Sequence, residues 1–183
     1  MDLLKECLNL SCRGVYDSVE SAAVEGSVYV YWFGVSMKKE FVVRHRVAFS
    51  ETDMAGIVHF SNYFRYMEIA EDAFFREHGQ SLIRREEGEV HGWPRVRASC
   101  DFKAPISFGE EVEIVLFVSE VKVRAIEFAF ALYRVEDGLR GKKIARGRMT
   151  TVHVVRRTGE AVHEMEALAI PEDFQKTLAE WVD

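Results

Sequence analysis

Apolar and polar residues alternate along five stretches of the chain, and a period of two residues predicts β-strands. The five stretches cover residues 41–49, 95–102, 112–118, 126–132 and 143–155. Between the first two, apolar residues recur at every third or fourth position, which predicts an amphipathic helix over about 61–78 that stops at Gly79. Ser61 or Asn62 is the expected N-cap. One strand, one long helix and then four antiparallel strands make an α+β arrangement.

Turn residues divide this pattern. We expect a turn over 105–109 and a tight β-hairpin turn at Glu136-Asp137-Gly138, because Asp-Gly pairs favour such turns. Pro171 is expected to open a short C-terminal helix.

Residues 1–36 differ from the rest of the chain. They combine Ser, Gly and Asp clusters with one short apolar run, Val28 to Val35, and show no sustained period. We therefore expect an N-terminal extension over 1–36 and one domain over 37–183, with the extension dispensable or Met37 the natural start. The alternative is a genuine N-terminal segment that packs on the domain.

The composition limits the classes of function. With 183 residues, 48% of them hydrophobic and 30% charged, the chain fits one ordinary globular domain with a sizeable core. Its net charge of -6 disfavours nucleic acid as a partner, because phosphate binding needs a basic surface. No apolar run approaches the length of a membrane-spanning helix, so none is expected.

Cysteine and histidine usage adds expectations about compartment and cofactors. Cys7, Cys12 and Cys100 form no even disulfide framework, so we expect a reduced, cytoplasmic compartment. Polar residues between positions 9 and 13 interrupt any early apolar core, so a signal peptide is not expected. The histidines have no metal-ligand spacing and the sequence has no glycine-rich nucleotide motif, so we expect no metal and no cofactor.

A carboxylate in a turn just before the predicted helix is the most informative local feature. The stretch from Ser50 to Tyr63 reads Ser-Glu-Thr-Asp-Met-Ala-Gly-Ile-Val-His-Phe-Ser-Asn-Tyr. Asp53 can act as a nucleophile or base there, and amides at the helix N-terminus can hold a developing oxyanion. The alternative is that Asp53 only caps the turn, as many Asp residues ahead of a glycine do.

This stretch resembles the 4-hydroxybenzoyl-CoA thioesterase family, whose members include Tol–Pal-associated acyl-CoA thioesterases. The matching residues are Phe49, Thr52, Asp53, Gly56, Ile57, Val58, Asn62, Tyr63 and Glu68. The resemblance covers roughly residues 40 to 170 and implies the hotdog fold, in which an antiparallel sheet wraps around a long central helix. The strands beyond the motif match the family only in their pattern.

The resemblance implies roles for individual residues. Asp53 would attack the thioester or activate water, and the backbone amide of Phe60 would bind the oxyanion. Asn62 would position the loop, and Gly56 would lie near the ligand or adopt a positive φ. His59 would line the site, although a polar loop residue is an equal alternative. For Glu68 we favour a structural role. Some other hotdog thioesterases, in contrast, carry the reacting carboxylate on the helix.

The resemblance also implies an acyl-CoA substrate. The phosphates of CoA need cations, and Lys122 and Arg124 are the main candidates. Further candidates are Lys142, Lys143, Arg146 and Arg148. Family members are dimers or tetramers with sites between subunits, so we expect a homodimer or homotetramer.

The function expected from the sequence is therefore hydrolysis of an acyl-CoA to a carboxylic acid and CoA. A non-catalytic hotdog module that binds acyl-CoA or a partner is the alternative. A hotdog hydratase is disfavoured, because Phe60 and Ser61 stand where a His-Gly pair would be expected.

Overall fold

The computed structural model describes residues 21–24, 27–30, 39–157, 159 and 161–182. The chain divides into two compact units, Met1–Met37 and Lys38–Asp183. In the first unit the described residues form an antiparallel hairpin of β1 (Ser21–Val24) and β2 (Ser27–Val30). The division falls beside the boundary expected from the sequence. That residues 1–36 are dispensable stays a prediction, and most of them lie outside the described residues.

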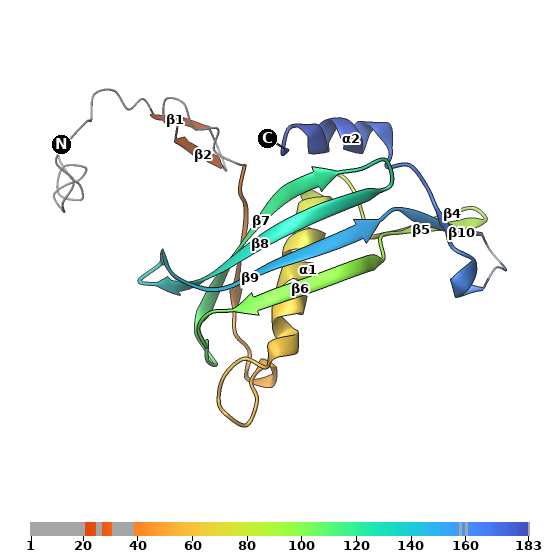
Figure 1. Cartoon of the computed structure of the whole chain (residues 1–183). Helices are drawn as coiled ribbons and strands as arrows, with labels where there is room; N and C mark the ends of the chain where they lie inside the picture. The colour runs from red at the N-terminus through yellow and green to blue at the C-terminus, as the bar shows by residue number, and fades with distance from the viewer. Residues whose placement is uncertain (1–20, 25–26, 31–38, 158, 160, 183) are drawn as a thin grey trace. The chain divides into compact units, whose positions relative to one another are not determined.

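Five strands form the main antiparallel sheet of the second unit, in the order β3-β7-β8-β9-β6 (Figure 1). Their bounds are Phe41–Arg46 for β3, Arg95–Phe102 for β6, Glu111–Val121 for β7, Ala125–Glu136 for β8 and Leu139–Val152 for β9. Each corresponds to a predicted strand. The first ends earlier than predicted, because Phe49 lies in a short 3-10 helix, η1 (Phe49–Glu51).

A second, smaller sheet has the order β11-β10-β5-β4. Its strands are β4 (Ile83–Glu86), β5 (Glu89–Gly92), β10 (Val154–Arg157) and β11 (Glu166–Ala167), with a 3-10 turn, η2 (Val162–Glu164), before β11. Its first two strands, β4 and β5, were not among the predicted strands.

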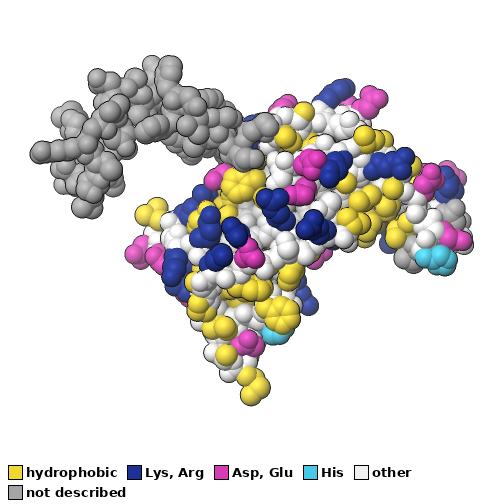
Figure 2. All heavy atoms as spheres, in the orientation of Figure 1, with side chains coloured by type: hydrophobic (Ala, Val, Ile, Leu, Met, Phe, Trp, Pro, Cys, Tyr) yellow, Lys and Arg dark blue, Asp and Glu magenta, His cyan; other side chains and the backbone are white. Residues whose placement is uncertain are grey.

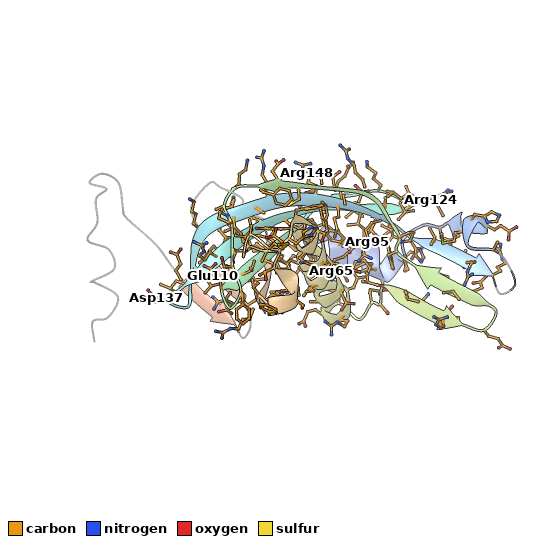
Figure 3. The ribbon with its side chains drawn as sticks, turned by 90° about the horizontal axis from the view of Figure 1, so that it is seen from below. Arg65, Arg95, Glu110, Arg124, Asp137 and Arg148 are labelled. Carbon is orange, nitrogen blue, oxygen red and sulfur yellow. The ribbon has the colours of Figure 1, made fainter. Side chains whose placement is uncertain are left out.

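Helix α1 (Phe60–Glu77) packs along the inner face of the main sheet, and Figure 3 shows the sheet arching over it. The helix is displaced by one residue from its predicted span. The inner face consists of fully or nearly fully buried side chains of β7 and β8: Val112, Ile114, Leu116, Val118, Ile126, Phe128, Phe130 and Leu132. Burial of this much apolar surface against one helix face is the main source of stability. The predicted α+β hotdog arrangement is confirmed.

Gly147 of β9 allows the helix to approach the sheet closely. A Cβ atom at this position would lie 2.3 Å from the Sδ atom of Met67 and 2.9 Å from the backbone oxygen of Ser99. Met67 is fully buried on α1. Since no side chain fits between Met67 and the sheet, position 147 requires glycine in this packing.

The turns and the C-terminal helix follow the sequence prediction. Asp137 and Gly138 have φ values of 52° and 78°, the positive values that a two-residue hairpin turn between β8 and β9 requires. Helix α2 (Glu172–Ala179) begins after Pro171, and its Phe174 side chain is buried in the core.

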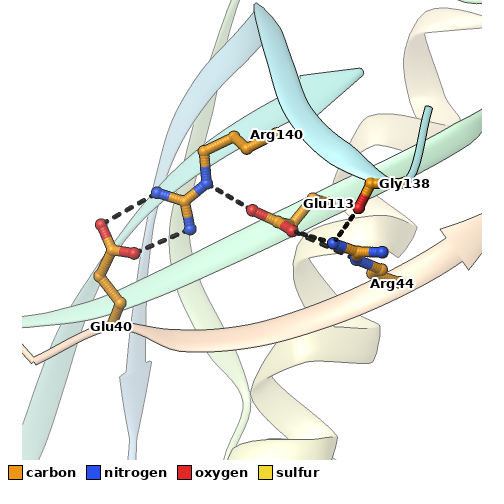
Figure 4. Close-up of polar contacts among 5 residues, drawn as sticks. All are labelled: Glu40, Arg44, Glu113, Gly138 and Arg140. Carbon is orange, nitrogen blue, oxygen red and sulfur yellow. Dashed lines mark hydrogen bonds and ion pairs between the residues drawn. The ribbon is translucent and has the colours of Figure 1, made fainter. Parts of the chain in front are cut away.

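An ion network fastens the outer face of the sheet (Figure 4). The buried Glu113 carboxylate of β7 accepts hydrogen bonds from Arg44 Nη2, at 3.1 Å, and from Arg140 Nε. Arg140 also donates to Glu40 at 2.8 Å, and Arg44 donates to the Gly138 carbonyl at 3.0 Å. The network thereby links β3, β7 and the β8–β9 hairpin.

Candidate active site

The predicted catalytic turn is a small hairpin between β3 and helix α1. Thr52 and Val58 form an antiparallel bridge. Asp53 N donates to Ile57 O at 2.9 Å, and Gly56 N donates to Asp53 O at 2.9 Å. Gly56 has a φ of 77°, which explains the glycine at this position. The hairpin thus pairs Asp53 with Ile57, three residues before the helix begins.

The Asp53 side chain is exposed at the tip of this hairpin. Its Oδ1 atom accepts a hydrogen bond from the Ala55 amide at 2.8 Å. Within the described part of the chain no hydrogen bond reaches Oδ2. One carboxylate oxygen is therefore held by the turn, while the other is available to a substrate or a water molecule.

Helix α1 begins two residues after the bridge residue Val58, where the hairpin ends. His59 is the N-cap. Its Nδ1 atom accepts a hydrogen bond from the Ser61 amide at 3.4 Å and lies 2.8 Å from Ser61 Oγ. The prediction that Ser61 or Asn62 caps the helix was wrong, because the imidazole nitrogen of His59 accepts the bond that a short polar side chain usually accepts. Among the described residues the Phe60 amide has no acceptor, so it remains free at the positive end of the helix dipole.

Asn62 is buried in the first turn of the helix. Its Nδ2 atom donates to the Glu51 carbonyl oxygen at 2.7 Å, and the His59 amide donates to the same oxygen at 2.9 Å. The Asn62 side chain therefore ties the helix to the hairpin.

The Glu51 carboxylate holds the base of the hairpin, two residues before Asp53. It accepts from the Ala48 amide at 2.8 Å and from the Tyr66 hydroxyl at 3.0 Å, and His45 Nε2 lies 3.0 Å from both oxygens. Burial alone would raise the pKa of Glu51, but these hydrogen bonds lower it below its ordinary value. Burial and the neighbouring Glu51 carboxylate raise the pKa of Tyr66, so the phenol stays a donor.

Apolar side chains surround the hairpin. Phe60 and Phe102 are 60% and 48% exposed, and Phe102 packs edge-to-face on Tyr63. Phe49 and Phe108 form a second exposed edge-to-face pair. Figure 2 shows hydrophobic side chains at the end of the domain that carries this hairpin. A carboxylate, a free helix amide and an apolar surface are the groups that acyl transfer on an apolar acyl group needs.

The thioesterase-like superfamily profile matches residues 47–178, which include the hairpin, helix α1 and every strand of the main sheet except β3. The chain belongs to this superfamily. It is 35% identical to a protein described as a putative esterase from Aquifex aeolicus, over 67% of this chain and 89% of the relative. It is 32% identical to the acyl-CoA thioesterase YbgC of Helicobacter pylori, over 44% of this chain and 57% of YbgC.

The solved structure of a gentisyl-coenzyme A thioesterase has the same fold as this chain. It superposes with a TM-score of 0.60 and 28% identity, covering 73% of this chain and 98% of the other. The superfamily resemblance stated from the sequence is thus confirmed.

The structure does not bring all the predicted residues of this thioesterase-like site together in one chain. Asp53, Gly56, His59, Phe60 and Asn62 share the hairpin and the helix start. Lys122 and Arg124 lie in the loop after β7. Glu110 lies just before β7, and its carbonyl oxygen accepts a hydrogen bond from the Val47 amide, at the end of the sheet that carries the hairpin. Figure 3 shows Glu110 and Arg124 at opposite ends of the sheet. The 11 residues of β7 span roughly 35 Å, so these cations are far from Asp53 of the same chain.

Three of the candidate cations already have carboxylate partners. Arg146 binds Asp101 at 2.7 Å and Arg148 binds Glu127 at 2.7 Å, both on the outer face of the sheet. Lys122 pairs with Glu120 at 3.1 Å.

The helix carboxylates also have partners. Glu68 is exposed, 3.3 Å from Arg95 Nη1, in line with the structural role favoured for it. Arg95 also binds the fully buried Glu71 through Nε at 2.9 Å. Burial raises the pKa of Glu71, an effect that Arg95 opposes.

Other reactive groups of this thioesterase-like domain lie outside the hairpin. Burial raises the pKa of the Cys100 thiol to about 11, so it is not a thiolate at neutral pH. Among the described residues no cluster of three or more His, Cys, Asp or Glu has the arrangement of a metal site. Neither described helix is long and apolar enough to cross a membrane.

A cavity of about 130 Å³ lies beyond the C-terminal end of α1, away from the hairpin. It is lined by Gly79, Gln80, Ser81, Arg84, His91, Trp93, His153 and Pro171. The His153 ring is buried between those of His91 and Trp93, and its Nδ1 atom lies 2.8 Å from the Ala169 carbonyl.

Sequence reasoning missed the residues that anchor the hairpin in this superfamily member. Glu51 lies in the Ser50–Tyr63 stretch, but the sequence alone assigns it no role. The signals were present, because His45 falls on the apolar face of a strand and Tyr66 lies on the apolar stripe of the helix. Tyr66 is buried and His45 is half-buried, and polar side chains in such positions need a hydrogen-bond partner, which Glu51 supplies.

Proposed function

We propose that this protein hydrolyses acyl-CoA thioesters to a carboxylic acid and CoA, with Asp53 as the reacting carboxylate. The observation that carries the proposal is the free Oδ2 oxygen of Asp53 in a hairpin that leads directly to the unpaired Phe60 amide. The thioesterase activity named for the relatives supports it.

Asp53 would act by one of two routes that reach the same products. In the first, its carboxylate bonds to the thioester carbon, the C–S bond breaks, CoA leaves as a thiolate, and water hydrolyses the resulting anhydride. In the second, Asp53 takes a proton from water, whose oxygen attacks the same carbon, and the C–S bond then breaks to release CoA as a thiolate. In both, the Phe60 amide binds the oxyanion, and no cofactor is needed because CoA is part of the substrate.

We also propose a cytoplasmic homodimer or homotetramer that joins chains through β6. This strand is one edge of the main sheet, and its residues from Val96 to Phe102 are exposed except Cys100, with Val96 64% exposed. An exposed edge with apolar side chains is a natural pairing surface. Light scattering after gel filtration should show an oligomer that Ala98→Asp weakens, and a wild-type monomer would contradict this assembly.

Thiol release from aromatic, short-chain and long-chain acyl-CoAs tests the activity. The wild type should release CoA from at least one of these substrates, and Asp53→Asn should lose at least about 100-fold in kcat while remaining folded. Asp72→Asn is the matched control, because Asp72 is a half-exposed helix carboxylate paired with Arg76. An unchanged rate in Asp53→Asn would remove Asp53 from the mechanism. CoA binding without any thiol release would favour the non-catalytic binding module.

A further inference from the structure

We propose that Glu51 is the positioning residue of this site. Its carboxylate holds the hairpin so that Asp53 is positioned to react, and it does not itself touch the substrate. This inference rests on the proposed function, because it requires Asp53 to be the reacting group.

Asp53 has few contacts of its own. Its side chain is exposed, and the only hydrogen bond recorded for its carboxylate within the described residues comes from Ala55, in the same turn. That bond fixes the carboxylate relative to the turn and not relative to the helix. The position of Asp53 relative to the Phe60 amide must therefore come from the contacts that hold the base of the hairpin.

Glu51 provides that anchor through its side chain. Its carboxylate joins β3, through His45, to helix α1, through Tyr66, and it also accepts from the Ala48 amide at the start of η1. Only 16% of the side chain is exposed. His45 and Tyr66 are the titratable groups that face it from the two elements packed against it, and both can donate.

The backbone of the same residue anchors the second strand of the hairpin. The Glu51 carbonyl accepts from the His59 amide and from Asn62 Nδ2, at 2.9 and 2.7 Å. Asn62 and His59 belong to the helix start that presents the Phe60 amide. Glu51 therefore holds both halves of the proposed site, the carboxylate hairpin and the oxyanion donor, in one hydrogen-bonded unit.

Small displacements of a reacting group are costly. A shift of about 1 Å can reduce a rate by about 100-fold, because attack requires near-contact and aligned geometry. The lowered pKa of Glu51 agrees with a positioning role, since the group stays an acceptor through the neutral pH range. Loss of its bonds should therefore lower kcat and leave CoA binding largely intact.

The test compares Glu51→Ala with Glu51→Gln by steady-state kinetics and by calorimetric binding of CoA. Glu51→Ala should lose about 100-fold in kcat. Glu51→Gln keeps an acceptor for Ala48 or Tyr66 and should lose a smaller factor, about 10-fold. The dissociation constant of CoA should stay within about twofold of the wild-type value in both. If Glu51→Ala does not fold, Glu51→Gln and Tyr66→Phe, which removes one donor, carry the same comparison.

A double-mutant cycle separates positioning from independent catalysis. In an Asp53→Asn background, adding Glu51→Gln should change the residual rate by less than about twofold, because residues that act through one another are not additive. Glu113→Gln is the matched control: it removes another buried carboxylate, which should lower stability but leave the kcat of the folded protein unchanged.

The outcomes separate the two proposals. A wild-type rate in folded Glu51→Ala would overturn the positioning role even if Asp53→Asn is inactive. If Glu51→Ala does not fold, wild-type rates in both single variants, Glu51→Gln and Tyr66→Phe, would overturn it. An active Asp53→Asn would instead overturn the assignment of Asp53. Full additivity of the two changes would show that Glu51 acts independently of Asp53, which also contradicts the proposal.

Discussion

Replacing Gly147 with alanine should destabilise the contact between helix α1 and the main sheet. The added Cβ would lie 2.3 Å from Met67 Sδ and 2.9 Å from Ser99 O, below the 3.4–4 Å of ordinary contact. Met67 is fully buried, so its side chain has no open space to enter. Ser99 belongs to β6 and pairs with Arg148 next to the substitution, so its oxygen can move only if the β6–β9 pairing moves with it.

Over-packing of this kind costs about 1–3 kcal/mol. The loss of glycine flexibility in the unfolded chain offsets about 0.4–1 kcal/mol of that cost, so a net loss of about 1–2 kcal/mol in unfolding free energy is expected for Gly147→Ala. Gly92→Ala is the matched control. Gly92 also lies in a strand, but its nearest atoms would be 3.9 Å and 4.0 Å away, so this variant should be as stable as the wild type or slightly more stable.

Urea unfolding followed by circular dichroism measures both variants against the wild type. The Gly147→Ala midpoint should fall with an unchanged slope, because the surface exposed on unfolding stays the same. Shortening the obstructing side chain in Gly147→Ala/Met67→Ala should give less than the sum of the two single losses. Equal midpoints for Gly147→Ala and Gly92→Ala would refute the argument that helix α1 is seated against Gly147.

Three other perturbations test the ion network, the buried histidine and the hairpin turn. Glu113→Gln should lose about 1–3 kcal/mol in unfolding free energy, measured by urea unfolding. The lower part of that range reflects solvent screening of its half-exposed arginine partners. Unchanged stability would contradict the network's role. Burial, with repulsion from His91 and Arg84, lowers the pKa of His153, so the unfolded chain binds its proton more readily and stability should fall as the pH drops below about 6.5. Thermal melts between pH 7.5 and 5.5 should show this slope, and His153→Gln should flatten it. Gly138→Val forces a branched side chain into a φ of 78° and should cost about 1–2 kcal/mol, measured by the same urea titration.

The elements that sequence reasoning predicted well have long periodic patterns. The helix was placed within one residue because Tyr63, Met67, Ala70 and Phe74 recur at helical spacing, and all four are buried. The Asp-Gly turn was predicted from residue chemistry alone. In contrast, β4 and β5 are four residues each, and β4 is exposed throughout, so neither leaves a periodic signal.

The candidate site was predictable where it is local in sequence. The motif from Asp53 to Asn62 forms one hairpin and one helix start, so sequence proximity and spatial proximity agree. The anchoring of Glu51 by His45 and Tyr66 depends on the tertiary packing of β3 against α1. The His59 cap was missed because histidine is an uncommon cap, and its role depends on the ring nitrogen facing Ser61.

The separation of Asp53 from Lys122 and Arg124 gives the proposed oligomer a functional reason. Antiparallel pairing of β6 with its copy would place the Arg95 end of one strand beside the Phe102 end of the other. Phe102 lies at the Asp53 end of its chain, since it packs on Tyr63 of the helix start. Arg95 lies at the Arg124 end, since it pairs with Thr151, which pairs with Ile126 just after that loop. Two-fold pairing through β6 would therefore bring the cations of one chain toward the Asp53 carboxylate of the other. In the proposed oligomer, a single chain carries both Asp53 and these cations but would still need its copy to hold CoA at Asp53.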